Sequence, residues 1–121
     1  MYKNKKIVVF GVSQDPSKYG HKIFDTLQKR QFSVYGINPK GGSVNGSALY
    51  TDISQLPVKA EVAIMVIPPA FLTEAVKACI AYGIKEIWFQ PGAQLPEALE
   101  LAVKAKISAY EACFMVENGL W

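Results

Sequence analysis

The chain has 121 residues, of which 50% are hydrophobic and 19% are charged, and its formal net charge is +3. This balance predicts one globular domain over residues 1–121 and excludes an intrinsically disordered protein. The charge is too small and too scattered to favour a nucleic-acid partner. The longest apolar run, residues 62–67, is much shorter than the ~20 residues that span a bilayer. Because no signal-peptide pattern precedes the first apolar run, we expect a cytoplasmic protein.

Five runs rich in β-branched and aromatic residues predict strands. They are residues 7–10, 32–37, 60–67, 84–89 and 107–110. Apolar spacing, together with end signals such as Gly83 and Pro96, predicts helices. The predicted helices are residues 21–30, 70–82 and 96–106. Residues 48–50 are compatible with a short strand and residues 52–56 with a helical turn, and residues 111–121 are predicted to form a tail.

The alternation of strands and helices predicts an α/β fold with a single, doubly wound, five-stranded parallel sheet in the order 3-2-1-4-5. In such a sheet, ligands bind beyond the carboxyl ends of the strands where the winding reverses. The predicted order places this point beside the first and fourth strands. Four loops converge there, namely residues 11–19, 38–42, 68–71 and 90–94.

The first of these loops has features of a phosphate-binding turn. Gly11 follows a buried strand and precedes a helix, and at such a position a glycine lets the backbone approach a phosphate that the helix N–H groups bind. Gly11 is the only glycine of the turn until Gly20, so the G-x-G-x-x-G pattern of dinucleotide sites is absent. An ordinary turn between a strand and a helix is the alternative interpretation.

The end of the second predicted strand bears on the choice of ligand. NAD sites usually place an Asp or Glu there to bind the ribose hydroxyls, but this sequence has Asn38, Pro39 and Lys40. A carboxylate would repel an additional ribose phosphate, whereas Lys40 can pair with one. The loop therefore favours a phosphorylated adenosine, as in NADP or coenzyme A. The alternative is a solvated lysine in a turn.

Four segments of the chain resemble one known family. They are Gly11-Val12-Ser13, residues 38–42, residues 66–71, and residues 81–87 leading into Gln90-Pro91-Gly92. With this combination in register up to about Ala112, the sequence resembles the CoA-binding domain proteins. These are small stand-alone Rossmann-like domains related to the N-terminal domain of the succinyl-CoA synthetase α subunit.

The resemblance implies a coenzyme A or acyl-CoA ligand and a role for each matching segment. It implies that the turn from Ser13 to Pro16 receives the pyrophosphate, that Lys40 binds the phosphorylated ADP part, and that residues 89–91 line the opposite wall. Together with the converging loops, it implies the following cofactor-binding residues: Gly11, Val12, Ser13, Gln14, Asp15, Pro16, His21, Asn38, Pro39, Lys40, Ile67, Pro68, Phe71, Phe89, Gln90, Pro91 and Gly92.

The sequence offers little for catalysis. His21 is its only histidine, so no histidine-rich metal site is predicted, and His21 is interpreted either as a phosphate ligand or as a capping or surface residue. The carboxylates fall on separate segments without the spacing of a catalytic pair. In the related ligase the phosphohistidine lies in a second domain, which we do not expect in this chain. We therefore expect a CoA-binding module without catalytic residues.

Two other classes of function stay open. An NADP-dependent oxidoreductase, or a subunit of one, would use the same fold and the same Lys40. A Rossmann-like interaction module would have an empty ligand site. The apolar residues 114–116 and 120–121 are compatible with a homodimer contact and equally with packing on their own domain.

Overall fold

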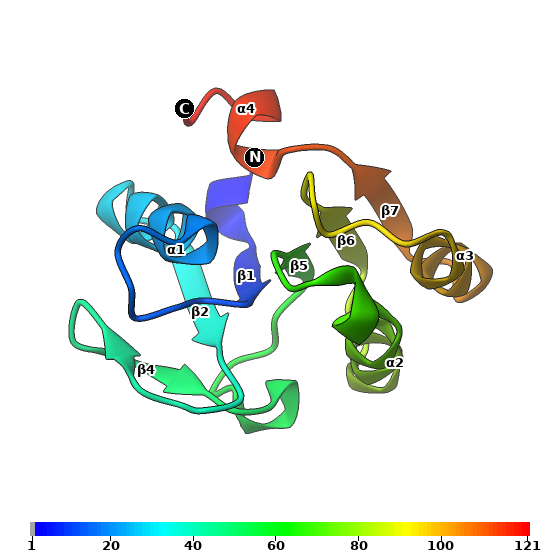
Figure 1. The fold of residues 1–121 in the computed structure, drawn as a ribbon, viewed down its shortest axis with the longest axis horizontal. Helices are drawn as coiled ribbons and strands as arrows, with labels where there is room; N and C mark the ends of the chain where they lie inside the picture. Colours follow the sequence, from blue (N-terminus) through cyan, green and yellow to red (C-terminus); the bar gives the residue numbers. More distant parts are fainter. Residues whose placement is uncertain (1) are drawn as a thin grey trace.

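The computed structural model describes residues 2–121, in which a seven-stranded sheet lies between two layers of helices (Figure 1). The strands are β1 (Lys6–Phe10), β2 (Ser33–Ile37), β3 (Ser43–Val44), β4 (Ser47–Tyr50), β5 (Val62–Met65), β6 (Glu86–Phe89) and β7 (Ser108–Glu111). Their order is β3-β4-β2-β1-β5-β6-β7. Each neighbouring pair is parallel except β3 and β4, which form an antiparallel hairpin.

The α/β class and the parallel winding are confirmed, but the predicted number and order of strands are wrong. The strand predicted third in the chain is β5, and it pairs with β1 rather than with β2. The place beside β2 belongs to β4, through the pairs Gly36 with Leu49 and Ile37 with Tyr50. The winding therefore reverses between β1 and β5, not beside residues 84–89 as predicted.

The short strand considered at residues 48–50 is confirmed as β4, and a tight turn places it beside β2. Asn45 and Gly46 connect β3 to β4, and both have positive φ angles, 53° and 80°. Asn-Gly is the dipeptide that two-residue hairpins favour, because both central residues must adopt this left-handed backbone. The turn folds the chain back, so that β4 reaches β2.

The helices cover the two faces of the sheet separately (Figure 1). They are the 3₁₀ turns η1 (Tyr2–Asn4), η2 (Ile53–Gln55) and η3 (Pro69–Phe71), and the α-helices α1 (Tyr19–Lys29), α2 (Leu72–Tyr82), α3 (Pro96–Lys104) and α4 (Phe114–Glu117). The three predicted helices are confirmed, with ends that shift by at most two residues. None of the helices within residues 2–121 is long and apolar enough to cross a membrane.

Alternate residues of β1 belong to the two cores. Ile7 and Val9 pack in the cluster with α1 and α4, whereas Val8 and Phe10 pack in the cluster with α2 and α3. This division follows from the strand geometry, which points successive side chains to opposite faces. The predicted tail belongs to the first cluster, since Phe114 and other residues after β7 are fully buried there. The chain after β7 therefore folds back on its own domain.

Helix α1 begins in direct contact with the turn after β1. Gly11 has a φ of +102°, and Gly20, in the first turn of α1, is buried against it. A Cβ atom on Gly20 would overlap the carbonyl oxygen of Gly11. The missing side chain thus lets the N-terminus of α1 lie directly over the end of β1.

We expect Gly20→Ala to lower the free energy of unfolding by about 2–3 kcal/mol, because the backbone of the turn must move to accept the methyl group. Urea denaturation of both proteins measures this difference. Gly46→Ala is the matched control, since a Cβ there has no heavy atom within 4 Å. Its positive φ alone should cost about 1–2 kcal/mol. Equal losses in the two variants would show that the contact with Gly11 is unimportant.

Candidate functional site

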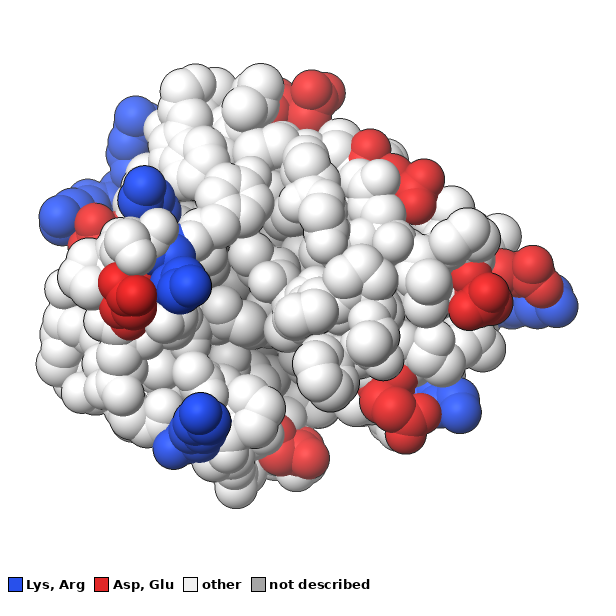
Figure 2. All heavy atoms as spheres, in the orientation of Figure 1, with Lys and Arg blue, Asp and Glu red and all other residues white. Residues whose placement is uncertain are grey.

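The carboxyl ends of the strands open onto a hollow in the surface (Figure 2). Lysine and arginine side chains gather on the α1 side of this face, and aspartate and glutamate side chains gather over α2 and α3 (Figures 1 and 2). The winding of the sheet reverses between β1 and β5, and the carboxyl ends of these two parallel strands lie at this face. Crevices at such switch points are the usual ligand sites of open α/β sheets. The charge distribution favours an anionic group on the α1 side.

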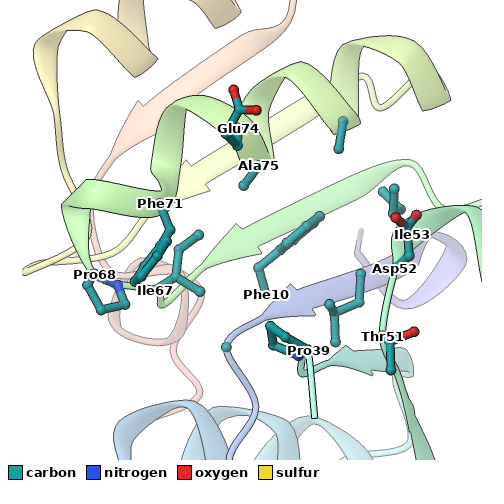
Figure 3. A pocket seen from close by; sticks show the side chains of 13 residues that line it. Phe10, Pro39, Thr51, Asp52, Ile53, Ile67, Pro68, Phe71, Glu74 and Ala75 are labelled. Carbon is teal, nitrogen blue, oxygen red and sulfur yellow. The ribbon is translucent and has the colours of Figure 1, made fainter. Parts of the chain in front are cut away.

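One cavity of about 450 Å³ lies between the ends of β1, β2 and β4 and the helix α2 (Figure 3). Its walls are mostly apolar, with Phe10 in the interior and Phe71 beside Pro68 at one end. Phe71 is 62% exposed, so its ring forms an edge of the cavity rather than part of the core. A mostly apolar cavity of this kind suits an uncharged planar group such as a nucleobase.

Five of the residues proposed from the sequence line this cavity, namely Gly11, Pro39, Ile67, Pro68 and Phe71. Other lining residues follow β4 or belong to α2, and they were not proposed. They are Thr51, Asp52, Ile53, Glu74, Ala75 and Ala78. The hairpin dipeptide Asn45-Gly46 was the signal that could have placed the first three, because it brings the end of β4 to this edge.

The turn between β1 and α1 is held by its own polar groups. The Ser13 hydroxyl accepts a hydrogen bond from the Asp15 N–H at 3.0 Å, and the Asp15 carboxylate accepts one from the Ser17 N–H at 2.9 Å. The Ser17 N–H also holds the pKa of Asp15 below its ordinary value. Lys18 occupies the N-cap position of α1, and its side chain has no acceptor atom that could bind the first N–H groups of the helix. The first N–H groups of α1 therefore stay available for an anion.

Hydrogen bonds connect this turn to the loop after β2. The N–H groups of Gly11 and Val12 both donate to the Ile37 carbonyl, at 3.0 and 3.1 Å. The Asn38 side chain donates to the Val12 carbonyl at 2.9 Å and accepts from the Lys40 N–H at 2.8 Å. Asn38 thus holds the two loops together, while the Lys40 side chain is exposed.

Other proposed residues of the turn have contacts of their own. The Gln14 side-chain oxygen accepts from the Ser43 N–H at 3.1 Å. His21 contacts the Ser13 carbonyl through Nδ1 at 2.7 Å, and since a carbonyl only accepts, Nδ1 carries the proton. Pro16 and His21 also line a polar cavity of about 490 Å³ on the outer side of α1. The His21 ring therefore supports the turn from its outer side.

A third cavity, of about 350 Å³, adjoins the first. It shares Ile67 and Pro68 with the first cavity, of about 450 Å³, and it includes Pro91 and Gly92 from the loop after β6. These two adjoining cavities are called the larger and the smaller cavity below. Its remaining lining residues are Tyr19, Val66, Pro69 and Ala93. Tyr19 was not proposed from the sequence. As the first residue of α1, it places an aromatic wall next to the turn.

Val12, Phe89 and Gln90 are placed differently from the rest of the proposed set. All three are 0% exposed; Val12 belongs to the core beside α1, and Phe89 belongs to the core beneath α2 and α3. The Gln90 amide donates to the Tyr19 hydroxyl at 3.0 Å and accepts from the Phe114 N–H at 2.8 Å. Gln90 therefore contacts the cavity wall from behind.

Tyr19 and Cys113 form a polar pair at the end of this chain of contacts. The Tyr19 oxygen lies 3.2 Å from the Cys113 sulfur. Burial, and then the contact with Cys113, raise the pKa of Tyr19 to about 12. Burial alone would raise the pKa of Cys113, but hydrogen bonds from the Tyr19 hydroxyl, neighbouring N–H groups and Gln90 hold it below its ordinary value. Both cysteines are free thiols.

Metal ligands do not cluster in the part of the chain that the structure describes. Within residues 2–121, histidine, cysteine and carboxylate side chains form no group of three that could hold a metal ion. The carboxylates nearest the larger cavity are Asp52 and Glu74. One carboxylate oxygen of Asp52 accepts a hydrogen bond from the Ser54 N–H at 2.8 Å.

Comparison with known proteins identifies relatives of the whole fold. The family described as "CoA binding domain" matches residues 5–119. The α subunit of an ADP-forming acetate–CoA ligase II from Pyrococcus furiosus is 32% identical over 82 residues, which are 67% of this chain and 18% of the ligase subunit. An ADP-forming acetate–CoA ligase I from Archaeoglobus fulgidus is 30% identical over an alignment of 105 residues, which covers 78% of this chain and 15% of that enzyme. The chain thus spans less than a fifth of these curated relatives.

A solved structure agrees with these matches. A conserved hypothetical protein from Pyrococcus furiosus superimposes with a TM-score of 0.86 and 33% sequence identity. The match covers 93% of this chain and 98% of that protein. The similarity therefore extends over nearly all of both chains.

We expect Tyr19→Phe to slow the alkylation of Cys113 by iodoacetamide at neutral pH by about three- to tenfold. The substitution removes a donor that lowers the pKa of Cys113, so the pKa rises and less thiolate is present. Mass spectrometry of the modified peptide measures the rate. Cys79 is an internal control, because burial raises its pKa to about 12 and its side chain is 0% exposed. An unchanged or faster rate would mean that the hydroxyl does not stabilise the thiolate.

Proposed function

Because the chain belongs to the family of CoA binding domains, we propose that it binds coenzyme A or an acyl-CoA at the carboxyl edge of its sheet. The match over residues 5–119 carries the proposal. The arrangement of the same loops supports it, since an apolar cavity, a turn with available N–H groups and the exposed Lys40, next to the cavity residue Pro39, all follow the carboxyl ends of the strands. The proposal is limited to binding, because the matched segment is 18% of one ligase relative and 15% of another.

Each part of coenzyme A has a partner in this arrangement. The adenine base would enter the cavity of about 450 Å³, between Phe10 and Phe71. The diphosphate would bind the turn that contains Ser13, where the N-terminus of α1 provides N–H groups and a positive dipole end. Lys40 would pair with the 3′-phosphate, because it directly follows Pro39, which lines the cavity proposed for the base.

The structure of the turn explains why an anion would bind without large rearrangement. Asn38, the Ser13 hydroxyl and the Asp15 carboxylate already hold the loop backbone. A ligand therefore does not need to order the backbone, and the entropic cost of binding is smaller. The net charge of +3 favours association with a strongly anionic ligand.

Isothermal titration calorimetry with coenzyme A, dephospho-CoA, NADP and NAD tests the proposal directly. We expect heat with both CoA forms and stronger binding of coenzyme A. If neither form produces heat, the protein is not a CoA binder. Tight binding of NADPH that coenzyme A does not compete with would favour an oxidoreductase instead. Native mass spectrometry of freshly purified protein tests the third class, an interaction module, which would carry no nucleotide.

We expect Lys40→Ala to weaken the binding of coenzyme A by about ten- to hundredfold, because it removes a charge-assisted contact with the 3′-phosphate. Dephospho-CoA lacks this phosphate, so its affinity should hardly change. Rising salt should weaken the binding of coenzyme A to the native protein more than to the variant. Calorimetry at two salt concentrations measures both effects.

Lys85→Ala is the matched control for this substitution. Lys85 is also exposed, but it directly precedes β6 and so lies at the amino edge of the parallel sheet. Its removal should leave the affinity for coenzyme A unchanged. If Lys40→Ala weakens coenzyme A and dephospho-CoA by the same factor, Lys40 does not contact the 3′-phosphate.

A further inference from the structure

Gln90 is the one polar or charged residue among residues 2–121 that is buried. It directly follows β6, in a loop whose next two residues, Pro91 and Gly92, line the smaller cavity. Its own side chain is 0% exposed and points behind that wall. A buried amide is costly unless both of its ends are hydrogen-bonded. The two partners of Gln90 therefore indicate what the residue does.

The partners determine the direction of the hydrogen bonds. The Phe114 N–H can only donate, so the atom 2.8 Å from it is the Gln90 oxygen. The Gln90 nitrogen then faces Tyr19, and the phenol oxygen accepts its hydrogen at 3.0 Å. The Tyr19 proton is left to donate to Cys113, whose sulfur lies 3.2 Å away. The hydrogen bonds thus run in one direction, from the Phe114 N–H of α4 through the Gln90 side chain, which follows β6, to Tyr19 at the start of α1.

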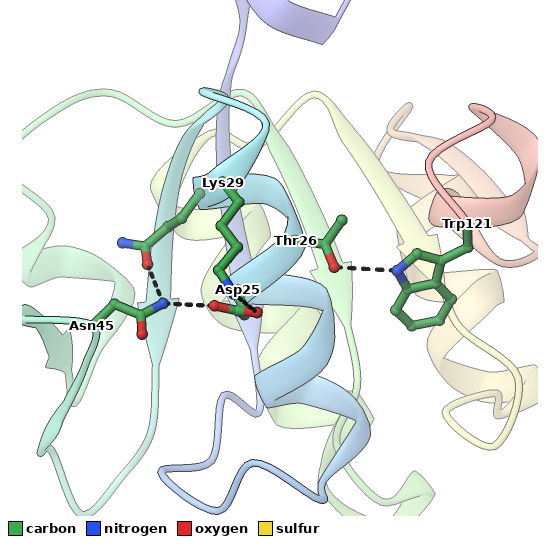
Figure 4. Close-up of polar contacts among 6 residues, drawn as sticks. Asp25, Thr26, Lys29, Asn45 and Trp121 are labelled. Carbon is green, nitrogen blue, oxygen red and sulfur yellow. Dashed lines mark hydrogen bonds and ion pairs between the residues drawn. The ribbon is translucent and has the colours of Figure 1, made fainter.

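The Tyr19 ring is also held from its other side. The rings of Tyr19 and Trp121 pack with their centroids 5.5 Å apart. Trp121 in turn donates from Nε1 to the Thr26 hydroxyl at 3.3 Å (Figure 4). With its hydroxyl bound by Gln90 and its ring against Trp121, Tyr19 has one defined position as a wall of the smaller cavity.

We propose that Gln90 is a positioning residue, which holds Tyr19 as the wall against which the pantetheine arm of the ligand packs. This inference rests on the proposed binding of coenzyme A. A ligand with its base in the larger cavity and its diphosphate at the turn reaches the smaller cavity only with its arm, because the two cavities adjoin at Ile67 and Pro68. The prolines and Tyr19 of the smaller cavity give the arm an apolar surface. Gln90 acts on the arm through Tyr19.

The test compares coenzyme A with adenosine 3′,5′-diphosphate, which keeps the base, the 3′-phosphate and the first 5′-phosphate but lacks the second 5′-phosphate and the arm. Calorimetry is done with the native protein, with Gln90→Met, with Tyr19→Phe and with the double variant. We expect each single variant to bind coenzyme A about tenfold more weakly, and adenosine 3′,5′-diphosphate within about twofold of the native affinity. The double variant should bind coenzyme A no more weakly than Gln90→Met alone, because both substitutions break the same series of hydrogen bonds.

Gln28→Met is the matched control for the loss of a glutamine hydrogen bond. Gln28 donates to the Ser47 hydroxyl at 2.8 Å, on the side of α1 that faces the β3–β4 hairpin. The affinity of this variant for coenzyme A should equal that of the native protein. If Gln90→Met does not fold, Tyr19→Phe still tests the inference, because it keeps the aromatic ring and removes only the hydroxyl that Gln90 holds.

The outcomes separate the inference from the proposed function. A native protein that binds neither ligand contradicts the binding of coenzyme A itself. If the native protein binds both ligands and the variants lose affinity for both by the same factor, Gln90 has only a structural role and the inference is wrong. Unchanged affinity for coenzyme A in Tyr19→Phe would also overturn it. Loss confined to coenzyme A supports a role for Gln90 in holding the wall of the arm site.

Discussion

The close approach of α1 to the turn after β1 is the contact on which the site depends. Gly20 lies against the Gly11 carbonyl with no room for a side chain between them. This contact directs the N–H groups of the first turn of α1 toward the carboxyl edge of the sheet. It also places Tyr19, one residue earlier, in the wall of the smaller cavity. Any larger residue at position 20 would move both features together.

The site combines a rigid backbone with exposed side chains. Asn38 and the two N–H groups that share the Ile37 carbonyl hold the loops after β1 and β2 as one unit. Lys40 and Phe71, by contrast, are exposed. A preorganised backbone lowers the entropic cost of binding an anion, while exposed side chains can contact the remaining parts of an irregular ligand. This division fits a ligand that combines anionic groups with an apolar part.

The C-terminal segment is part of the same arrangement. Phe114 and Met115 are fully buried in the core beside α1, and the Phe114 N–H binds Gln90. Trp121 packs against the Tyr19 ring. The last residues of the chain therefore stabilise the first residue of α1 from two directions. A change in this segment would therefore affect the cavity wall, although none of its residues lines the larger or the smaller cavity.

Several features of the fold and of the site could be predicted from the sequence, because they depend on neighbouring residues. Apolar runs and helix-end residues such as Gly83 and Pro96 determined the main strands and helices. The same patterns indicated the loops that meet at the carboxyl edge, and Pro39 and Phe71 in those loops do line the larger cavity. Asn45-Gly46 also carried local information, and neglecting it led to the wrong strand order.

Only the tertiary structure decided which side chains of those loops face a cavity. Gln90 and Pro91 are adjacent in the chain, yet Pro91 lines the smaller cavity and Gln90 is buried behind it. The partners of Gln90 are Tyr19, 71 residues away, and Phe114, 24 residues away. Hydrogen bonds over such separations form only after the sheet has brought the segments together. Local sequence patterns record no such contacts, so the sequence by itself determined where the loops meet, and packing decided how each side chain is used.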